Sequence, residues 1–91
     1  MGDLKDYVQR KGMLHARLDL AIGFARLASY FQQTGNLHEY REQLAFAETQ
    51  YQQIVKDWKE LQAEIEAEAD LFEKRRTAED CLDKLKRGEQ C

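Results

Sequence analysis

The dipeptide Gly35-Asn36 limits what this chain can fold into, because long helix-compatible sequence lies on both sides of it. Gly35 can adopt the left-handed backbone that ends a helix, and Asn36 can cap the helix that follows. The chain has no proline, and helix-forming residues dominate its composition. We therefore predict one all-α domain spanning 1–91, organised around a helical hairpin whose turn is 34–36.

The segment before the turn, about 4–33, has an apolar face that is too wide for a single neighbouring helix. One apolar row runs through Leu14, Leu18 and Ala21, and a second row lies beside it. Together they cover roughly 200° of the helical wheel. The second row is therefore expected to remain uncovered, and it consists of Met13, Leu20, Phe24, Leu27 and Phe31.

Gly23 lies beside a row of small residues, Ala21, Ala25 and Ala28. A glycine inside a helix costs about 1 kcal/mol relative to alanine. Two interpretations stay open: the small residues allow another helix to approach closely, or the helix simply tolerates the glycine.

The segment after the turn, about 37–75, carries a narrow apolar seam that alternates spacings of three and four residues, as in coiled coils. The seam runs from Leu37 to Phe72 and is interrupted at Glu68. Beyond Phe72 the apolar residues turn by about 100° on the helical wheel. Either this helix bends, or a short third helix spans about 78–87. The predicted architecture is an elongated, coiled-coil-like antiparallel two-helix hairpin, with the short C-terminal helix as an open alternative.

Folding the chain at the turn places Leu14 opposite Trp58 and Leu18 opposite Ile54. Basic residues near the start of the chain, including Lys11 and Arg17, then face the acidic segment 57–68. Opposite charges favour this antiparallel register, although each exposed pair contributes less than about 1 kcal/mol.

Two apolar regions are left without an intrachain neighbour in this hairpin: the second apolar row before the turn, and the C-terminal residues, which overhang the end of the hairpin. Such surfaces commonly bind partners. We predict that the chain associates with itself, as a homodimer or larger assembly, and with a partner protein. The predicted partner-binding residues are Met13, Leu20, Phe24, Leu27, Phe31, Leu71, Leu82 and Leu85, with charged contacts from Lys74, Arg75, Arg76, Glu64, Glu66 and Glu68.

The sequence offers little for catalysis. His15 and His38 lack neighbours at metal-ligand spacing, so no metal, cofactor or small-molecule substrate is predicted and we expect a protein that is not an enzyme. Cys81 and Cys91 would lie roughly 15 Å apart on a straight helix, which is beyond disulfide reach. We therefore expect two reduced thiols.

The chain has no long apolar run and no signal-peptide pattern, which predicts a cytoplasmic protein without a membrane segment. Its net charge of −3 disfavours nucleic acid as a partner. The predicted function is a non-catalytic protein-interaction module, such as a small adaptor or inhibitor of a host protein of the phage or mobile-element type. The alternatives are a secretion-type chaperone or assembly subunit, and a nucleic-acid-associated regulator that uses the basic C-terminal patch 74–87.

Overall fold

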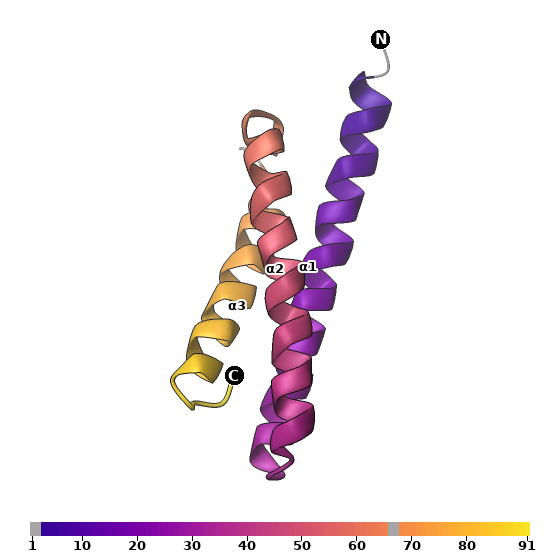
Figure 1. Cartoon of the computed structure of the whole chain (residues 1–91). Helices are drawn as coiled ribbons and strands as arrows, with labels where there is room; N and C mark the ends of the chain where they lie inside the picture. Colours follow the sequence, from indigo (N-terminus) through magenta and orange to yellow (C-terminus); the bar gives the residue numbers. More distant parts are fainter. Residues whose placement is uncertain (1–2, 66–67) are drawn as a thin grey trace.

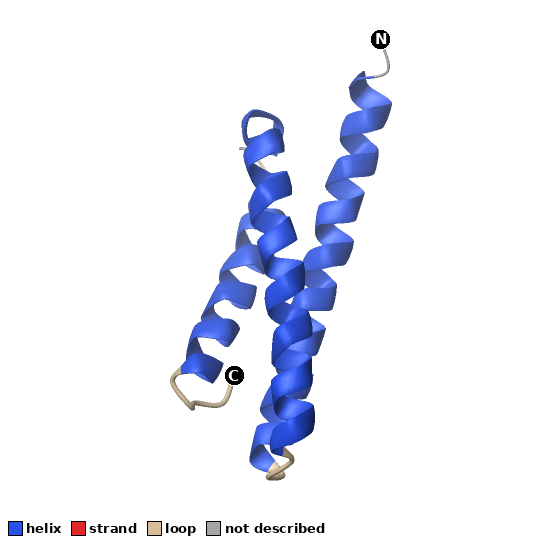
Figure 2. Ribbon diagram, in the orientation of Figure 1, coloured by secondary structure: helices blue, strands red, loops and turns tan. Residues whose placement is uncertain are grey.

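The computed structural model describes residues 3–65 and 68–91, without the side chains of 3–5 and 64. The described chain forms three helices, α1 (Asp3–Gln33), α2 (Leu37–Ile65) and α3 (Ala69–Lys86) (Figures 1 and 2). The prediction of an all-α fold is confirmed. The molecule is elongated, with principal extents of 52 × 19 × 15 Å.

The turn between α1 and α2 forms as its residues predict. Gly35 has a positive φ of 79°, and the Asn36 amide donates to the Phe31 carbonyl oxygen at 2.9 Å. The Asn36 side-chain oxygen accepts a hydrogen bond from the Glu39 amide at 3.2 Å, which caps the start of α2. These hydrogen bonds satisfy backbone groups at both helix ends, and the chain reverses direction within three residues.

The core between α1 and α2 has the predicted antiparallel register. Leu14, Leu18, Ile54 and Trp58 lie together in one buried cluster. The expected charge pairing is present at two positions: Arg17 Nε lies 3.7 Å from Asp57 Oδ2, and Lys11 Nζ lies 2.6 Å from Glu68 Oε1. Ala25, Ala28 and Ala47 are fully buried near the turn, where small side chains let the helices approach closely.

α3 differs from its prediction in length and starting point. The sequence predicts a second helix that extends to about 75, or a short third helix over about 78–87. Instead α2 ends at Ile65, and α3 begins at Ala69 and contains 18 residues. It runs back beside the hairpin toward the turn end (Figure 1), and most of its contacts are with α1.

Burial explains why a helix-compatible sequence is interrupted here. Folding α3 back buries Leu71, Leu82 and Leu85 almost completely, and burying each leucine contributes about 1.5–3 kcal/mol. An interruption forfeits a few helical hydrogen bonds, each with a net value of about 1 kcal/mol. The gain from burial exceeds that loss, so the three-helix arrangement is favoured over one long protruding helix.

The C-terminal segment contradicts the prediction of two reduced thiols, because Cys81 and Cys91 form a disulfide with a Cα–Cα distance of 4.9 Å. The prediction assumed one straight helix through both residues. α3 instead ends at Lys86, and Gly88, with φ of 79°, redirects the chain toward α1. There the Cys91 amide donates to the buried Ser29 hydroxyl at 3.3 Å.

No helix in the described ranges combines the length and the apolar character needed to cross a membrane.

Candidate interaction surface

An exposed apolar face of α1 is the main candidate for a functional surface. Met13, Leu20 and Leu27 expose 48%, 49% and 46% of their surface, and Phe24 and Phe31 are half-buried on the same side of the helix. These five residues are the second apolar row of the sequence. α3 does not cover them, because it packs on the side of α1 that carries His15, Asp19 and Ser29.

This face contains a shallow groove. Its volume is about 660 Å³, and it is lined by Ala16, Asp19, Leu20, Gly23, Phe24 and Leu27. Phe46 of α2 extends the apolar surface past α1, since its ring centroid lies 5.4 Å from that of Phe24 and 44% of its surface is exposed. We call Met13, Ala16, Leu20, Gly23, Phe24, Leu27, Phe31 and Phe46 the α1 apolar face.

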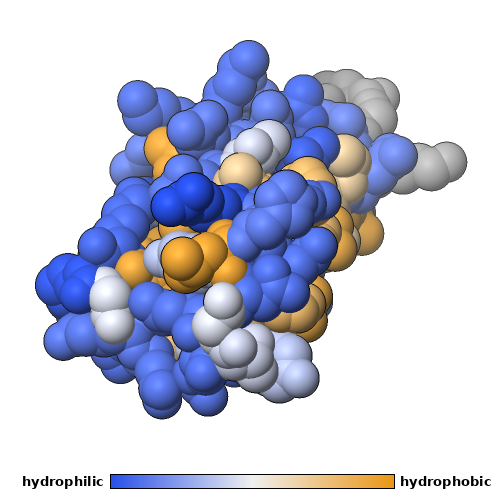
Figure 3. Space-filling view, turned by 60° about the horizontal axis from the view of Figure 1, so that its bottom comes forward, coloured by the Kyte–Doolittle hydropathy of each residue, from blue (hydrophilic) through white to orange (hydrophobic). Residues whose placement is uncertain are grey.

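The space-filling view gives the setting of such apolar groups. Seen with the turn end brought forward, most of the surface is hydrophilic, and hydrophobic residues show in confined areas between hydrophilic ones (Figure 3). A confined apolar area with a polar rim is the composition expected of a protein-binding surface.

Three of the predicted partner-binding residues are buried inside the chain. Leu71, Leu82 and Leu85 expose 0%, 4% and 1% of their surface and belong to the chain's own core. The sequence placed them on an overhang, whereas α3 folds back and buries them. We therefore exclude them from the candidate surface.

The predicted basic contacts are largely engaged within the chain. Lys74 Nζ lies 3.0 Å from Asp19 Oδ1 and 3.2 Å from His15 Nδ1. The Arg75 guanidinium lies 4.8 Å from the centre of the Trp58 ring and donates from Nε to Glu79 at 2.9 Å. Arg76 is exposed. Two of the three cations thus stabilise the packing of α3, which leaves a weaker basic patch than the sequence indicates.

Tyr51 joins the Arg75 cluster from α2. Its hydroxyl donates to the Glu79 carboxylate, which also accepts from Arg75. Burial and the hydrogen bond to Glu79 raise the pKa of Tyr51 to about 12. The hydrogen bond from Tyr51 in turn lowers the pKa of Glu79 below its usual value. These hydrogen bonds connect α3 to α2.

The predicted acidic contacts are only partly described. Glu68 accepts hydrogen bonds from Lys11 and Tyr7, at 2.6 and 3.2 Å, so it serves the internal packing of the chain. The side chain of Glu64 and all of Glu66 lie outside the described residues.

A polar groove between α1 and α3 is the second concave feature. Its volume is about 630 Å³, and its lining includes His15, Arg26, Asp70, Glu73 and Lys74. Charges of both signs alternate there, and Lys74 is already paired with Asp19. The groove therefore has no single charge preference that would select a ligand.

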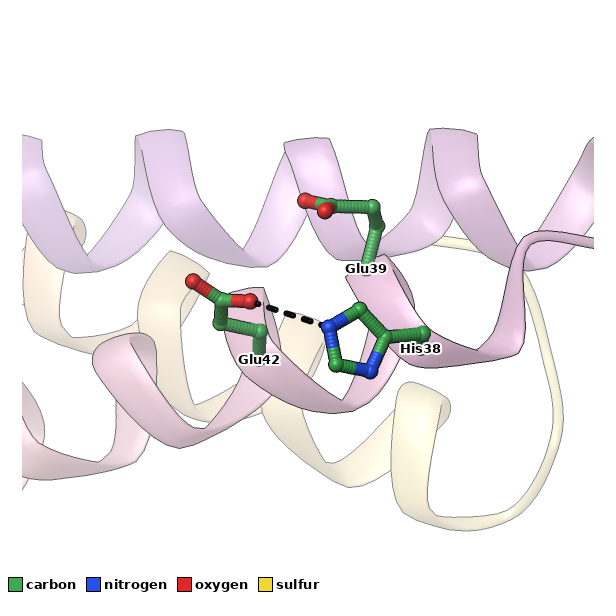
Figure 4. A group of neighbouring side chains, drawn as sticks. All are labelled: His38, Glu39 and Glu42. Carbon is green, nitrogen blue, oxygen red and sulfur yellow. Dashed lines mark ion pairs between the residues drawn. The ribbon is translucent and has the colours of Figure 1, made fainter.

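His38, Glu39 and Glu42 form the one group of three metal-competent side chains found in the described residues. His38 Nε2 lies 3.7 Å from a Glu42 oxygen, and the His38 side chain is 85% exposed (Figure 4). This is the geometry of an exposed ion pair one turn apart on a helix, which forms when the histidine is protonated. It adds little to stability and does not by itself define a metal site.

Four residues of the candidate surface were not predicted: Ala16, Gly23, Phe46 and the rim residue Asp19. Ala16 and Gly23 lie one turn from Leu20 on the same side of α1, so helical spacing could have indicated them. Phe46 is apolar but lies off the seam of α2, and that exception was the available signal.

No protein-family model matches the chain, and neither a curated protein nor a solved structure shows significant similarity to it.

Proposed function

We propose that this chain is a non-catalytic protein-interaction module that self-associates and binds a partner protein through the α1 apolar face. The observation that supports this proposal is the groove of Leu20, Gly23, Phe24 and Leu27, which α3 leaves open although it folds over the neighbouring side of α1. A chain of this size gains stability by burying such a face in an assembly.

The partner could be engaged in two ways that share this surface. In the first, the module is a small adaptor or inhibitor that occupies the working surface of another protein. In the second, it is a chaperone or assembly subunit that shields an apolar helix of its client. Size and fold class are the only support for choosing the first. The nucleic-acid alternative is disfavoured, because Lys74 and Arg75 are engaged in intrachain contacts.

The redox state of the two cysteines bears on the compartment in which the protein works. The sequence-based expectation is a cytoplasmic protein, whereas cytosolic thiols are normally kept reduced. The Cys81–Cys91 disulfide favours an oxidising compartment or an oxidising condition. Alkylation of free thiols in the native source, followed by mass measurement of the intact chain, distinguishes a reduced from an oxidised protein.

Self-association is tested by sedimentation of the wild-type chain over a range of micromolar concentrations. We expect the mass to rise with concentration and the Leu20→Ser/Leu27→Ser variant to remain monomeric. Circular dichroism should show unchanged helicity, because both leucines are about half exposed in the protomer.

Val8→Ser is the matched control, since Val8 is exposed and apolar but lies outside the α1 apolar face. It should associate like the wild-type chain. A wild-type chain that stays monomeric throughout, or a double variant that associates normally, contradicts the self-association part of the proposal. Capture of a partner by the wild-type chain and equally by the double variant contradicts the partner-binding part.

A further inference from the structure

The charges at the edge of the α1 apolar face indicate how a second copy of the chain would be oriented. We propose that two copies pack their α1 helices antiparallel, about a two-fold axis close to Gly23, with Asp19 of each copy paired with Arg26 of the other. This inference rests on the self-association proposed above and specifies the geometry of that same surface.

Asp19 and Arg26 lie on one edge of α1. They are seven residues apart, which is two helical turns, and they differ by about 20° on the helical wheel. The axial separation is about 10.5 Å, so the two side chains do not pair within one helix. Both line the polar groove beside the apolar face.

The two charged groups also remain accessible to a second chain. Asp19 contacts Lys74 at 3.0 Å, but its side chain is 63% exposed and its carboxylate can accept further hydrogen bonds. Arg26 is exposed, and within the described residues its guanidinium has no ion-pair partner. The apolar face is therefore bordered by an accessible acid and an unpaired base.

A two-fold axis perpendicular to two antiparallel helices brings the same edge of each helix together. The direction of the second helix is reversed, so an acid that precedes the axis along one helix meets a base that follows the axis along the other. With the axis close to Gly23, Asp19 lies opposite Arg26 of the second copy, and the symmetric pair forms as well. The edge is thus complementary to itself in this orientation.

The apolar residues agree with the same axis. Residues at equal distances on either side of it lie opposite each other, so Met13 faces Phe31 and Leu20 faces the Phe24–Leu27 region of the second copy. All of these side chains are exposed or half-buried in the protomer. The contact would extend from Met13 to Phe31, a sequence separation of 18 residues, which is roughly 27 Å of helix.

Gly23 allows the helices to approach closely at the axis. A Cβ atom placed there would meet no heavy atom within 4 Å, and the residue is exposed. The protomer itself therefore does not require the glycine for packing. At a two-fold axis its lack of a side chain lets the two backbones come together, as small residues do between closely packed helices.

A parallel pair would lack this complementarity. A two-fold axis along the helices brings the Asp19–Arg26 edge against the opposite edge, which carries Phe24. Asp19 and Arg26 would then face an aromatic residue instead of each other.

Complementation between charge variants tests the register. Each of the single variants, Asp19→Arg and Arg26→Asp, brings like charges together at both symmetric contacts. The dissociation constant of each homodimer should therefore rise about tenfold. Mixing the two variants restores opposite charges at every contact. We expect an equimolar mixture to form heterodimers with an affinity near that of the wild-type homodimer, measured by sedimentation and by intact-mass analysis of the complex.

Two further variants test the position of the axis. Gly23→Arg places two cations across the axis and should weaken the dimer at least tenfold. Gly12→Arg is the matched control, because Gly12 is also exposed and helical, and a Cβ atom added to it would meet no heavy atom within 4 Å, but it lies away from the axis. It should associate like the wild-type chain.

The outcomes separate this inference from the proposed function. A wild-type dimer that Leu20→Ser/Leu27→Ser abolishes, but whose charge variants do not complement each other, overturns the antiparallel register and leaves the interaction surface intact. An unaffected Gly23→Arg dimer likewise overturns the position of the axis. A wild-type chain that stays monomeric overturns both proposals.

Discussion

Lys11 Nζ lies 2.6 Å from Glu68 Oε1, and these two residues are the polar exceptions in the apolar rows of their segments. The first apolar row of α1 also contains Tyr7, and Lys11 interrupts it between Tyr7 and Leu14. Glu68 interrupts the seam that begins in α2. Because they meet in the folded chain, each compensates for the other, and the Tyr7 hydroxyl donates to the same Glu68 oxygen at 3.2 Å. Glu68 lies immediately before α3, so the pair connects the start of that helix to α1.

The pair should make stability depend on acidity. The hydrogen bond from Lys11 holds the pKa of Glu68 below its usual value. The stabilisation that the Lys11–Glu68 pair gives the folded chain is therefore fully present above the pKa that Glu68 has in the unfolded chain. This stabilisation is lost as the pH falls through the lower pKa that Glu68 has in the folded chain. Urea unfolding at a series of acidic pH values should show this loss of stability. The Glu68→Gln variant should lose less stability over the same pH range. Asp6→Asn, in the exposed Asp6–Arg10 pair, is the control and should have a smaller effect. An identical acid dependence in Glu68→Gln would contradict the assignment.

Tyr51 should make stability fall in alkali. Its pKa is raised by burial and by the hydrogen bond to Glu79, to about 12 in the folded chain. The unfolded chain loses this proton near pH 10, so the stabilisation is present below about pH 10 and is lost as pH rises toward 12. Tyrosinate absorbance of the wild-type chain should show a late-titrating component that is missing in Tyr51→Phe. A variant with the same titration curve as the wild-type chain would exclude Tyr51 as the source.

The Cys81–Cys91 disulfide should stabilise the docking of the C-terminal tail. It closes a loop with a sequence separation of 10 residues, and the chain-entropy estimate for such a loop is about 2–3 kcal/mol. Reduction, or the Cys81→Ser/Cys91→Ser variant, should lower the free energy of unfolding by about that amount. Denaturation with and without reductant measures it. The double variant is the control, because its stability should not respond to reductant. If the stability of the oxidised wild-type chain were equally insensitive to reductant, this prediction would be contradicted.

Leu71→Ala should destabilise the chain strongly. Leu71 is fully buried in the core shared by the three helices, and replacing a buried leucine by alanine typically costs about 2–5 kcal/mol. Phe72→Ala, next to it but 46% exposed, should cost less although the side chain is larger. Thermal or urea denaturation compares them. A fully stable Leu71→Ala variant would mean that α3 does not pack as described.

The candidate surface was partly visible in the sequence. The width of the apolar arc on α1 indicated that one neighbour could not cover it, and Met13, Leu20 and Leu27 are indeed exposed. The three leucines of α3 were misplaced, because periodicity shows which residues are apolar but not which neighbour covers them. The disulfide was missed for a related reason: its geometry depends on a chain reversal at Gly88 and not on helical spacing.

By itself, the sequence determined the all-α class, the turn and the α1–α2 register. These depend on local properties: the left-handed backbone of Gly35, the Asn36 cap, and apolar spacings that repeat along each helix. Only the tertiary structure decided where α2 ends and on which side of α1 the third helix lies. The segment around Ile65 contains no glycine or proline that would end a helix. The interruption is chosen because Leu71, Leu82 and Leu85 gain more from burial than the broken helix loses, and that difference arises only when all three helices are packed together.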